Sequence, residues 1–173
     1  MTSLVSRFPS LKPSFEGNHN LVGLYFASSW CPDCVPATEK LKAMYENQQP
    51  ASAYGEKVIE IVYISSDRCK EEMENYRTKL HPWLAIPFDN ATERNGLKKY
   101  FGICAASEMS SLNISHRLDG IPSLVVLDVY TQDILTTNGI AGLNKYGPKD
   151  VCQIWLNKRN VLMNQNDKHN PDY

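Results

Sequence analysis

Two cysteines separated by two residues, Cys31 and Cys34, are the residues of this sequence best suited to chemistry. They lie in Trp-Cys-Pro-Asp-Cys, between an apolar run at 21–26 and a stretch at 35–45 whose apolar residues recur with helical spacing. A thiol at the start of a helix meets unpaired backbone N–H groups, which favour its thiolate form. A second thiol one turn further along can close a disulfide with the first. The motif therefore predicts a reversible dithiol–disulfide switch, with Cys31 attacking and Cys34 resolving.

Other roles for such a pair are less well supported. A zinc site needs a second pair of Cys or His ligands, whereas His81, Cys104 and His116 are isolated in the sequence. We therefore expect no metal and no bound cofactor. The chain has five cysteines, an odd number with one close pair, which is not the pattern of a structural disulfide framework. Cys69 could be a regulatory thiol, but an inert helix cysteine is the favoured interpretation, as it is for Cys104 and Cys152.

Composition narrows the class of protein. The chain has 173 residues, a formal net charge of -1, 42% hydrophobic and 21% charged residues, as is ordinary for a soluble globular protein. Nothing in this balance points to nucleic acid, and no apolar run is long enough to span a bilayer. The first 20 residues hold no continuous apolar core, so we expect no secretory signal and a cytoplasmic location. We also expect a monomer.

The elements that must position the cysteines follow from periodicity and turn residues. Strands are expected at 21–26, 58–64, 123–128 and 134–137, and helices at 35–45, 67–80, 92–100 and 151–162. The acidic run of Asp67, Glu71, Glu72 and Glu74 is interpreted as a solvated helix start. Between these elements we expect an irregular or short-stranded lead-in at 1–15, loops at 48–57, 103–119 and 139–148, an extended crossover at 81–88 and a polar tail at 164–173. This order predicts one α/β domain at 1–163, with a mixed sheet and helices on both faces.

Four segments in this order resemble the thioredoxin superfamily, and its tryparedoxin and nucleoredoxin branch in particular. They are Leu24 to Cys34, Tyr63 to Asp67, Pro82 to Phe88 and Gly120 to Asp128. Three features depart from that branch. The motif reads Cys-Pro-Asp-Cys-Val where Cys-Pro-Pro-Cys-Arg is common, Pro36 lies early in the helix, and the loop at 103–119 is longer than usual.

The resemblance implies a thioredoxin-like fold and a set of site residues. Cys31 and Cys34 would be the catalytic pair and redox-active disulfide, and Pro122 would be a cis-proline facing them. Substrate contacts are expected at Trp30, Pro32, Asp33, Ile121 and Pro122, with the Ile121 backbone docking an extended substrate. The alternative is that Ile121-Pro122 is only a turn into the next strand.

The expected function is that of a thiol–disulfide oxidoreductase, reducing disulfides of proteins such as peroxidases, or of small molecules. Trypanothione, glutathione or a thioredoxin reductase system would supply electrons. Thioredoxins have a buried Asp behind the motif, where this chain has Tyr25, and Val35 supplies no positive charge. With Asp33 between the cysteines, we expect a potential nearer that of thioredoxin, about -270 mV, than of a strong oxidant, about -120 mV. The alternative function is a redox-dependent binding regulator of nucleoredoxin type with little turnover, whose 103–119 loop contacts the partner.

Overall fold

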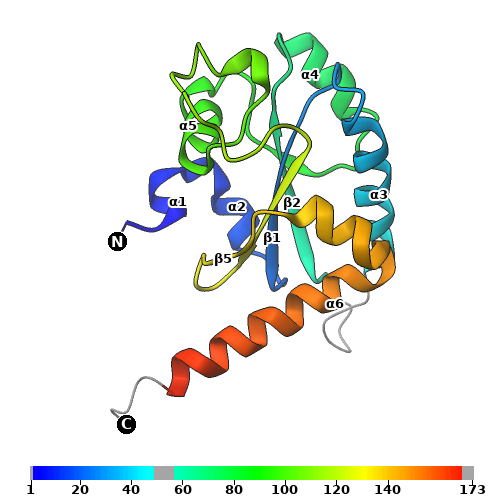
Figure 1. Cartoon of the computed structure of the whole chain (residues 1–173), viewed down its shortest axis with the longest axis vertical. Coiled ribbons are helices and arrows are strands. Elements are labelled where there is room, and N and C mark those ends of the chain that lie inside the picture. The colour runs from blue at the N-terminus through cyan, green and yellow to red at the C-terminus, as the bar shows by residue number, and fades with distance from the viewer. Residues whose placement is uncertain (1, 49–56, 169–173) are drawn as a thin grey trace.

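The computed structural model describes residues 2–48 and 57–168. Most of the loop predicted at 48–57 therefore lies outside the described residues. So do the last five residues of the predicted tail. Within them, a five-stranded sheet has the order β3-β2-β1-β4-β5 (Figure 1). β1 runs parallel to β2 and antiparallel to β4, so the prediction of a mixed sheet is confirmed. The strands are β1 (Leu21–Ala27), β2 (Ile59–Ser65), β3 (Leu84–Ala85), β4 (Ser123–Asp128) and β5 (Ile134–Thr136).

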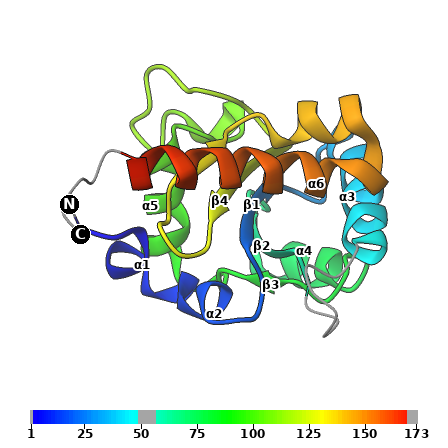
Figure 2. The same cartoon turned by 90° about the horizontal axis from the view of Figure 1, so that it is seen from below.

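Helices cover both faces of this sheet, also as predicted (Figures 1 and 2). On one face, α3 (Cys34–Asn47), α4 (Lys70–Arg77) and α6 (Gly139–Lys168) pack with alternate residues of β1, such as Leu21 and Tyr25. On the other face, α5 (Ala91–Phe101) and the N-terminal helices pack with Val22, Leu24 and Phe26. Every residue of β1 is buried, which explains why its sequence is apolar without alternation. The first cysteine therefore lies a short step after a strand that is buried along its whole length.

The N-terminal lead-in is helical, so the prediction of an irregular or short-stranded segment is wrong. It forms α1 (Leu4–Arg7), the 3-10 helix η1 (Pro9–Leu11) and α2 (Lys12–Phe15). Ser3 caps α1 by accepting a hydrogen bond from the Ser6 N–H, and Pro9 stands at the first turn of η1, where its missing N–H is tolerated. Leu4, Phe8 and Leu11 are buried against β1 and α5 instead of pairing with a sheet edge.

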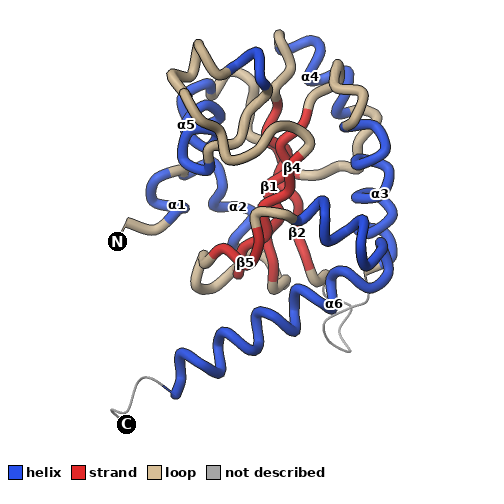
Figure 3. Tube along the Cα trace, in the orientation of Figure 1, coloured by secondary structure: helices blue, strands red, loops and turns tan. Residues whose placement is uncertain are grey.

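The prediction of a loop at 139–148 is also wrong, because these residues begin α6 (Figure 3). Gly139 opens the segment predicted as a loop, yet its role is close packing. A Cβ atom there would lie 2.7 Å from the Leu124 backbone oxygen of β4. Only Gly147 leaves helical geometry, with φ of 80°, and Pro148 restarts the helix after this kink. The helix then continues to Lys168, beyond the end expected at residue 162.

The long segment at 103–119 is a loop whose two ends meet. Gly102 ends α5 in the left-handed conformation with φ of 67°, and its carbonyl accepts a hydrogen bond of 2.7 Å from the Leu118 N–H. Ile103 and Asp119 form an isolated bridge beside this bond. The loop contains the 3-10 helix η2 (Ala106–Glu108). Among the described residues, no helix is long and apolar enough to cross a membrane.

Candidate active site

The two cysteines lie at the junction of β1 and α3. Cys34 is the first residue of α3, and its backbone N–H donates a 3.2 Å hydrogen bond to the Cys31 sulfur. Both thiols are free, Cys34 is fully buried and Cys31 is 5% exposed. An N–H donor at the start of a helix stabilises negative charge on the sulfur that it faces. Burial raises the pKa of the Cys34 thiol, and its contact with Cys31 raises it further, so Cys34 rests as a thiol.

The turn before β4 brings a second element to Cys31. The Ile121–Pro122 peptide bond is cis, as the resemblance implied. The Cys31 thiol donates to the Ile121 carbonyl at a sulfur–oxygen distance of 3.8 Å. Both Ile121 and Pro122 are half-buried, which leaves part of each accessible beside the sulfur. Residues 90 positions apart in the chain thus meet at the reactive thiol because β4 pairs with β1.

Trp30 forms another wall next to Cys31. Its indole N–H donates a 3.0 Å hydrogen bond to the Ser66 carbonyl at the end of β2. The Arg68 guanidinium lies over the indole ring, 5.3 Å from its centroid, a cation–π contact that sequence reasoning missed. Arg68 is exposed, so its charge stands at the rim of the site.

Asp67 is buried, which corrects its interpretation as part of a solvated helix start. It is 5% exposed, and Cys69, rather than a residue before it, is the N-cap of α4. One carboxylate oxygen accepts bonds from the Ser29 N–H at 2.7 Å and from the Ser29 hydroxyl at 2.5 Å. The other accepts from the Tyr63 hydroxyl at 2.8 Å and the Ser65 hydroxyl at 2.7 Å. Asp67 therefore fixes the segment that leads into Trp30 and Cys31.

Behind Cys34 lies a chain of hydroxyl groups. The Tyr25 hydroxyl donates to the Cys34 carbonyl at 3.4 Å and lies 2.7 Å from the Thr38 hydroxyl. Thr38 in turn lies 2.9 Å from the hydroxyl of Tyr76 on α4. Burial raises the pKa of Tyr25, so this position carries a neutral hydroxyl. Thr38 and Tyr76 were missed by sequence reasoning, although Thr38 lies four residues after Cys34 and so shares its helix face.

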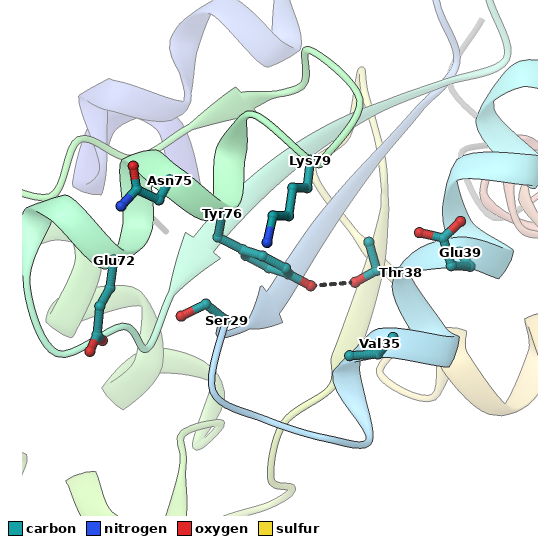
Figure 4. Close-up of a pocket in the computed structure, with 8 residues that line it drawn as sticks. All are labelled: Ser29, Val35, Thr38, Glu39, Glu72, Asn75, Tyr76 and Lys79. Carbon is teal, nitrogen blue, oxygen red and sulfur yellow. Dashed lines mark hydrogen bonds between the residues drawn. The ribbon is translucent and has the colours of Figure 1, made fainter.

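Two hollows flank the cysteine motif. The larger has a volume of about 430 Å³ and lies between the start of α3 and α4 (Figure 4). It is lined by Ser29, Val35, Thr38, Glu39, Glu72, Asn75, Tyr76 and Lys79. The smaller, of about 340 Å³, is bounded by Asp33 and Pro122 together with Pro36, Ala37, Lys40, Ile140 and Asn144. Asp33 and Pro32 are exposed. The predicted substrate positions therefore surround Cys31, and their roles in binding stay predictions.

The other cysteines lie in different surroundings. Cys69 is exposed, whereas Cys104 and Cys152 are buried. Burial raises the pKa of Cys104, and that of Cys152 to about 12. The described residues contain no group of three or more His, Cys, Asp or Glu side chains placed to hold a metal ion. His81 packs on the Tyr45 ring, with the ring centroids 4.5 Å apart.

The fold and this site agree with the relatives of the chain. A family model described as thioredoxin-like matches residues 18–132, so the chain belongs to the thioredoxin-like family, whose members are generally oxidoreductases. Within the family it has nucleoredoxin and tryparedoxin homologues, as the resemblance indicated. It is 34% identical over 116 residues to tryparedoxin of Trypanosoma brucei brucei, covering 67% of this chain and 66% of that protein.

Nucleoredoxin of Mus musculus is 32% identical over 131 residues, or 76% of this chain and 25% of that protein. The chain thus spans about a quarter of the length of the nucleoredoxins that it matches. Among solved structures, native tryparedoxin I from Crithidia fasciculata superposes with a TM-score of 0.58 at 30% identity, covering 79% of this chain and 78% of that chain. Thioredoxin from Wuchereria bancrofti gives a TM-score of 0.58 at 28% identity, covering 84% and 85%.

Proposed function

We propose that this protein reduces disulfides through Cys31 and Cys34. The observation that carries the proposal is the environment of the Cys31 sulfur. This sulfur accepts a hydrogen bond from the Cys34 N–H at 3.2 Å. It also faces the carbonyl of Ile121, the residue before the cis-proline. A nucleophilic sulfur with a stabilising donor on one side and an accessible turn on the other suits attack on an extended disulfide substrate.

The reaction would proceed in two exchanges. The Cys31 thiolate attacks one sulfur of the substrate disulfide, which releases the other as a thiolate and leaves a mixed disulfide. Cys34 then attacks Cys31, the bond from Cys31 to the substrate breaks, and the substrate leaves reduced. The protein is left with a Cys31–Cys34 disulfide, which a dithiol must reduce before the next turnover.

The identity of donor and substrate is part of the proposal. One solved relative is tryparedoxin II complexed with glutathionylspermidine, 28% identical to this chain, which supports a thiol of the glutathione type as donor. We therefore place trypanothione and glutathione before a thioredoxin reductase system. The proposed acceptors are disulfides of proteins, peroxidases among them. We further propose a cytoplasmic monomer that contacts neither nucleic acid nor membranes and needs no bound cofactor.

Serine substitutions of the two cysteines test the reaction. Cys31→Ser should abolish reduction of insulin disulfides with dithiothreitol as donor, because it removes the attacking sulfur. Cys34→Ser should instead accumulate mixed disulfides with the substrate, visible by mass spectrometry. Cys69→Ser is the matched control, since Cys69 is exposed and lies outside the site, and should retain full activity. Full activity of Cys31→Ser would end this proposal.

A second candidate function is redox-dependent partner binding with little turnover. It is favoured by the contact of the 103–119 loop with the site. Glu108 of this loop accepts a 2.7 Å hydrogen bond from the hydroxyl of Ser66, whose carbonyl holds Trp30. Negligible insulin reduction with trypanothione, glutathione and thioredoxin reductase as donors, alongside capture of a partner by only the dithiol or only the disulfide form, would select this function.

A further inference from the structure

The last residues of the 103–119 loop form an exposed segment that leads directly to the cis-proline turn. Residues 115–119 are all exposed, and two positions further along the chain lies Ile121. The fold holds this segment in place beside the end of α5, because the Leu118 N–H donates a 2.7 Å hydrogen bond to the Gly102 carbonyl. Side chains of the segment therefore stand at fixed positions on the approach to the turn.

Arg117 is the arginine of this segment, and its guanidinium lies against the backbone of the turn. Nη1 donates a 2.9 Å hydrogen bond to the Cys104 carbonyl. A Cβ atom at Gly120 would lie 3.1 Å from Nη1 and 3.3 Å from Cζ of Arg117, so the missing side chain of Gly120 makes room for the guanidinium. The next residue is Ile121, whose carbonyl oxygen is 3.8 Å from the Cys31 sulfur. A positive charge thus stands one residue away from the backbone that faces the reactive thiol.

The Arg117 guanidinium has N–H donors left for a ligand. A guanidinium carries five such donors and keeps its charge at ordinary pH. Among the described residues, the Arg117 side chain makes one hydrogen bond and no ion pair. The carboxylate of nearby Asp119 accepts the Gly120 N–H at 2.7 Å instead. An exposed guanidinium with unpaired donors in a planar fork suits the carboxylate of a bound molecule.

A negative charge stands on the other side of the turn. Asp33 is exposed and lines the smaller hollow together with Pro122. Since Gly120 and Pro122 flank Ile121 in the chain, the Arg117 charge lies on one side of the docking backbone and the Asp33 charge on the other. Successive residues of an extended chain are about 3.3 Å apart. An extended substrate that pairs with the turn therefore presents the two neighbours of its cysteine to opposite charges.

We propose that Arg117 binds the carboxylate of an acidic residue next to the cysteine of a substrate disulfide, and so selects acidic protein segments in one orientation. This inference rests on the proposed function, because it needs Cys31 to attack a disulfide docked on Ile121. The exchange itself is unchanged: the Cys31 sulfur bonds to the substrate sulfur, and the second substrate sulfur leaves as a thiolate. Arg117 is a specificity-determining residue that touches the substrate outside the reacting atoms, and Asp33 repels the same carboxylate on the other side.

Three capped peptides test this preference, with the central sequences Gln-Cys-Gln, Glu-Cys-Gln and Gln-Cys-Glu. The cysteine of each peptide carries a neutral thiopyridyl group, and its displacement releases a coloured thione that stopped flow follows. The protein is the Cys34→Ser, Cys69→Ser variant, which stops after the first exchange and lacks the exposed thiol. Peptide mapping by mass spectrometry checks that the mixed disulfide forms on Cys31.

The two Glu peptides have the same composition and differ only in orientation. We expect one of them to react about two- to fivefold faster than the other at low salt, the range that an exposed ion pair supplies. The neutral peptide should react at an intermediate rate, because it is neither attracted by Arg117 nor repelled by Asp33. The difference should shrink as salt is added, since exposed charges are screened.

Substitutions in the same protein identify the residue responsible. Arg117→Gln keeps a donor for the Cys104 carbonyl but has no charge, so the faster Glu peptide should lose its advantage over the neutral peptide. Arg117→Lys keeps the charge and should retain part of this advantage, which a purely structural role would not predict. Arg7→Gln is the matched control, because Arg7 is exposed and stacks on Tyr100 instead. It should leave all three rates unchanged.

The outcomes separate this inference from the proposed function. If no peptide reacts with Cys31 and the unsubstituted protein reduces no insulin, the proposed function fails. If the peptides react but the two Glu peptides do so at equal rates, the inference is wrong while the function stands. It is also wrong if the advantage survives in Arg117→Gln, or if Arg7→Gln removes it equally, because the net charge of the protein would then be responsible.

Glutathione also carries carboxylates, so the electron donor is the other source of this chemistry. A second measurement compares reduction of the Cys31–Cys34 disulfide by glutathione and by 2-mercaptoethanol, which has no carboxylate. We expect Arg117→Gln to change the ratio of these two rates less than it changes the ratio of the peptide rates. A selective loss with glutathione, with the peptide preference intact, would assign Arg117 to the donor and overturn the proposal.

Discussion

Asp67 and Lys98 are both buried charged groups near the active site, and their surroundings neutralise them in different ways. Asp67 receives four hydrogen bonds from N–H and O–H groups and has no cation paired with it within the described residues. Lys98, which is fully buried, forms an ion pair of 2.5 Å with Glu108 of the 103–119 loop. A carboxylate can be satisfied by several neutral donors, whereas the ammonium group of Lys98 depends on one carboxylate.

The two regions are linked. Glu108 accepts a hydrogen bond from the Ser66 hydroxyl, and Ser66 precedes Asp67 in the chain. Burial lowers the pKa of Arg94, and the charges of Glu108 and Asp67 partly offset this lowering, so both carboxylates act on the same arginine. Asp67 has several hydrogen-bond donors, whereas Lys98 has one carboxylate. Loss of one partner should therefore lower the free energy of unfolding less at Asp67 than at Lys98.

The largest effect is therefore expected from Glu108→Ala. It leaves the Lys98 charge buried and unpaired, and also removes the acceptor of the Ser66 hydroxyl and Ala105 N–H. The expected loss is about 3–5 kcal/mol in the free energy of unfolding, measured in urea. The double variant Lys98→Met with Glu108→Leu should recover most of it, because no charge is then left behind. Asp89→Ala, which breaks the exposed Lys70–Asp89 pair, is the control, and an equal loss there would contradict the comparison.

A smaller effect is expected from Asp67→Asn. The amide retains one acceptor oxygen but turns an NH₂ group toward hydroxyl donors, so we expect a loss of about 1.5–3 kcal/mol in the free energy of unfolding. Insulin reduction should slow as well, because Ser29 would no longer be held from both its N–H and its hydroxyl. Asp33→Asn is the matched control, since Asp33 is exposed and should unfold like the unsubstituted protein. A wild-type rate of insulin reduction by Asp67→Asn would show that Asp67 does not position the site.

The smallest effect concerns pH. Burial lowers the pKa of Lys98 below its ordinary value of 10.5 in the folded state. Between this lowered pKa and pH 10.5 the unfolded chain therefore binds more protons at this residue than the folded chain does, so its contribution to the free energy of unfolding rises with pH in that window. The slope for one proton is at most about 1.4 kcal/mol per pH unit. The unsubstituted protein should gain stability with pH relative to the Lys98→Met, Glu108→Leu variant, and parallel curves would refute the shift.

The sequence predicted much of the fold for a physical reason. Strands β1, β2 and β4 are buried on both faces along almost their whole length and therefore consist largely of apolar residues, and the two cysteines carry their own chemical signature. Glycine misled the prediction of a loop at 139–148, because Gly139 begins a helix and serves close packing against Leu124. The N-terminal helices are short and gain their stability from packing, which propensity does not report.

Only some of the site residues could be predicted from the sequence, because the roles of the others depend on contacts that the fold creates. Cys31 and Cys34 are recognisable by type and spacing and Pro122 through the family resemblance, but Asp67 looks like any acidic residue before a helix. Its burial depends on where Ser29, Tyr63 and Ser65 place their hydroxyl groups. Likewise, Thr38 and Tyr76 meet only because α3 and α4 pack on the same face of the sheet. Contacts between residues 38 positions apart follow from the fold and leave no local pattern.

The closed ends of the 103–119 loop have a consequence for protein engineering. Because the Leu118 N–H bonds the Gly102 carbonyl directly, we expect that the loop can be exchanged as a unit while the flanking chain keeps its path. A shortened loop without Glu108 would strand the Lys98 charge, so it should be built together with Lys98→Met. Such chimaeras would show whether partner choice can be transplanted between related proteins through this segment alone.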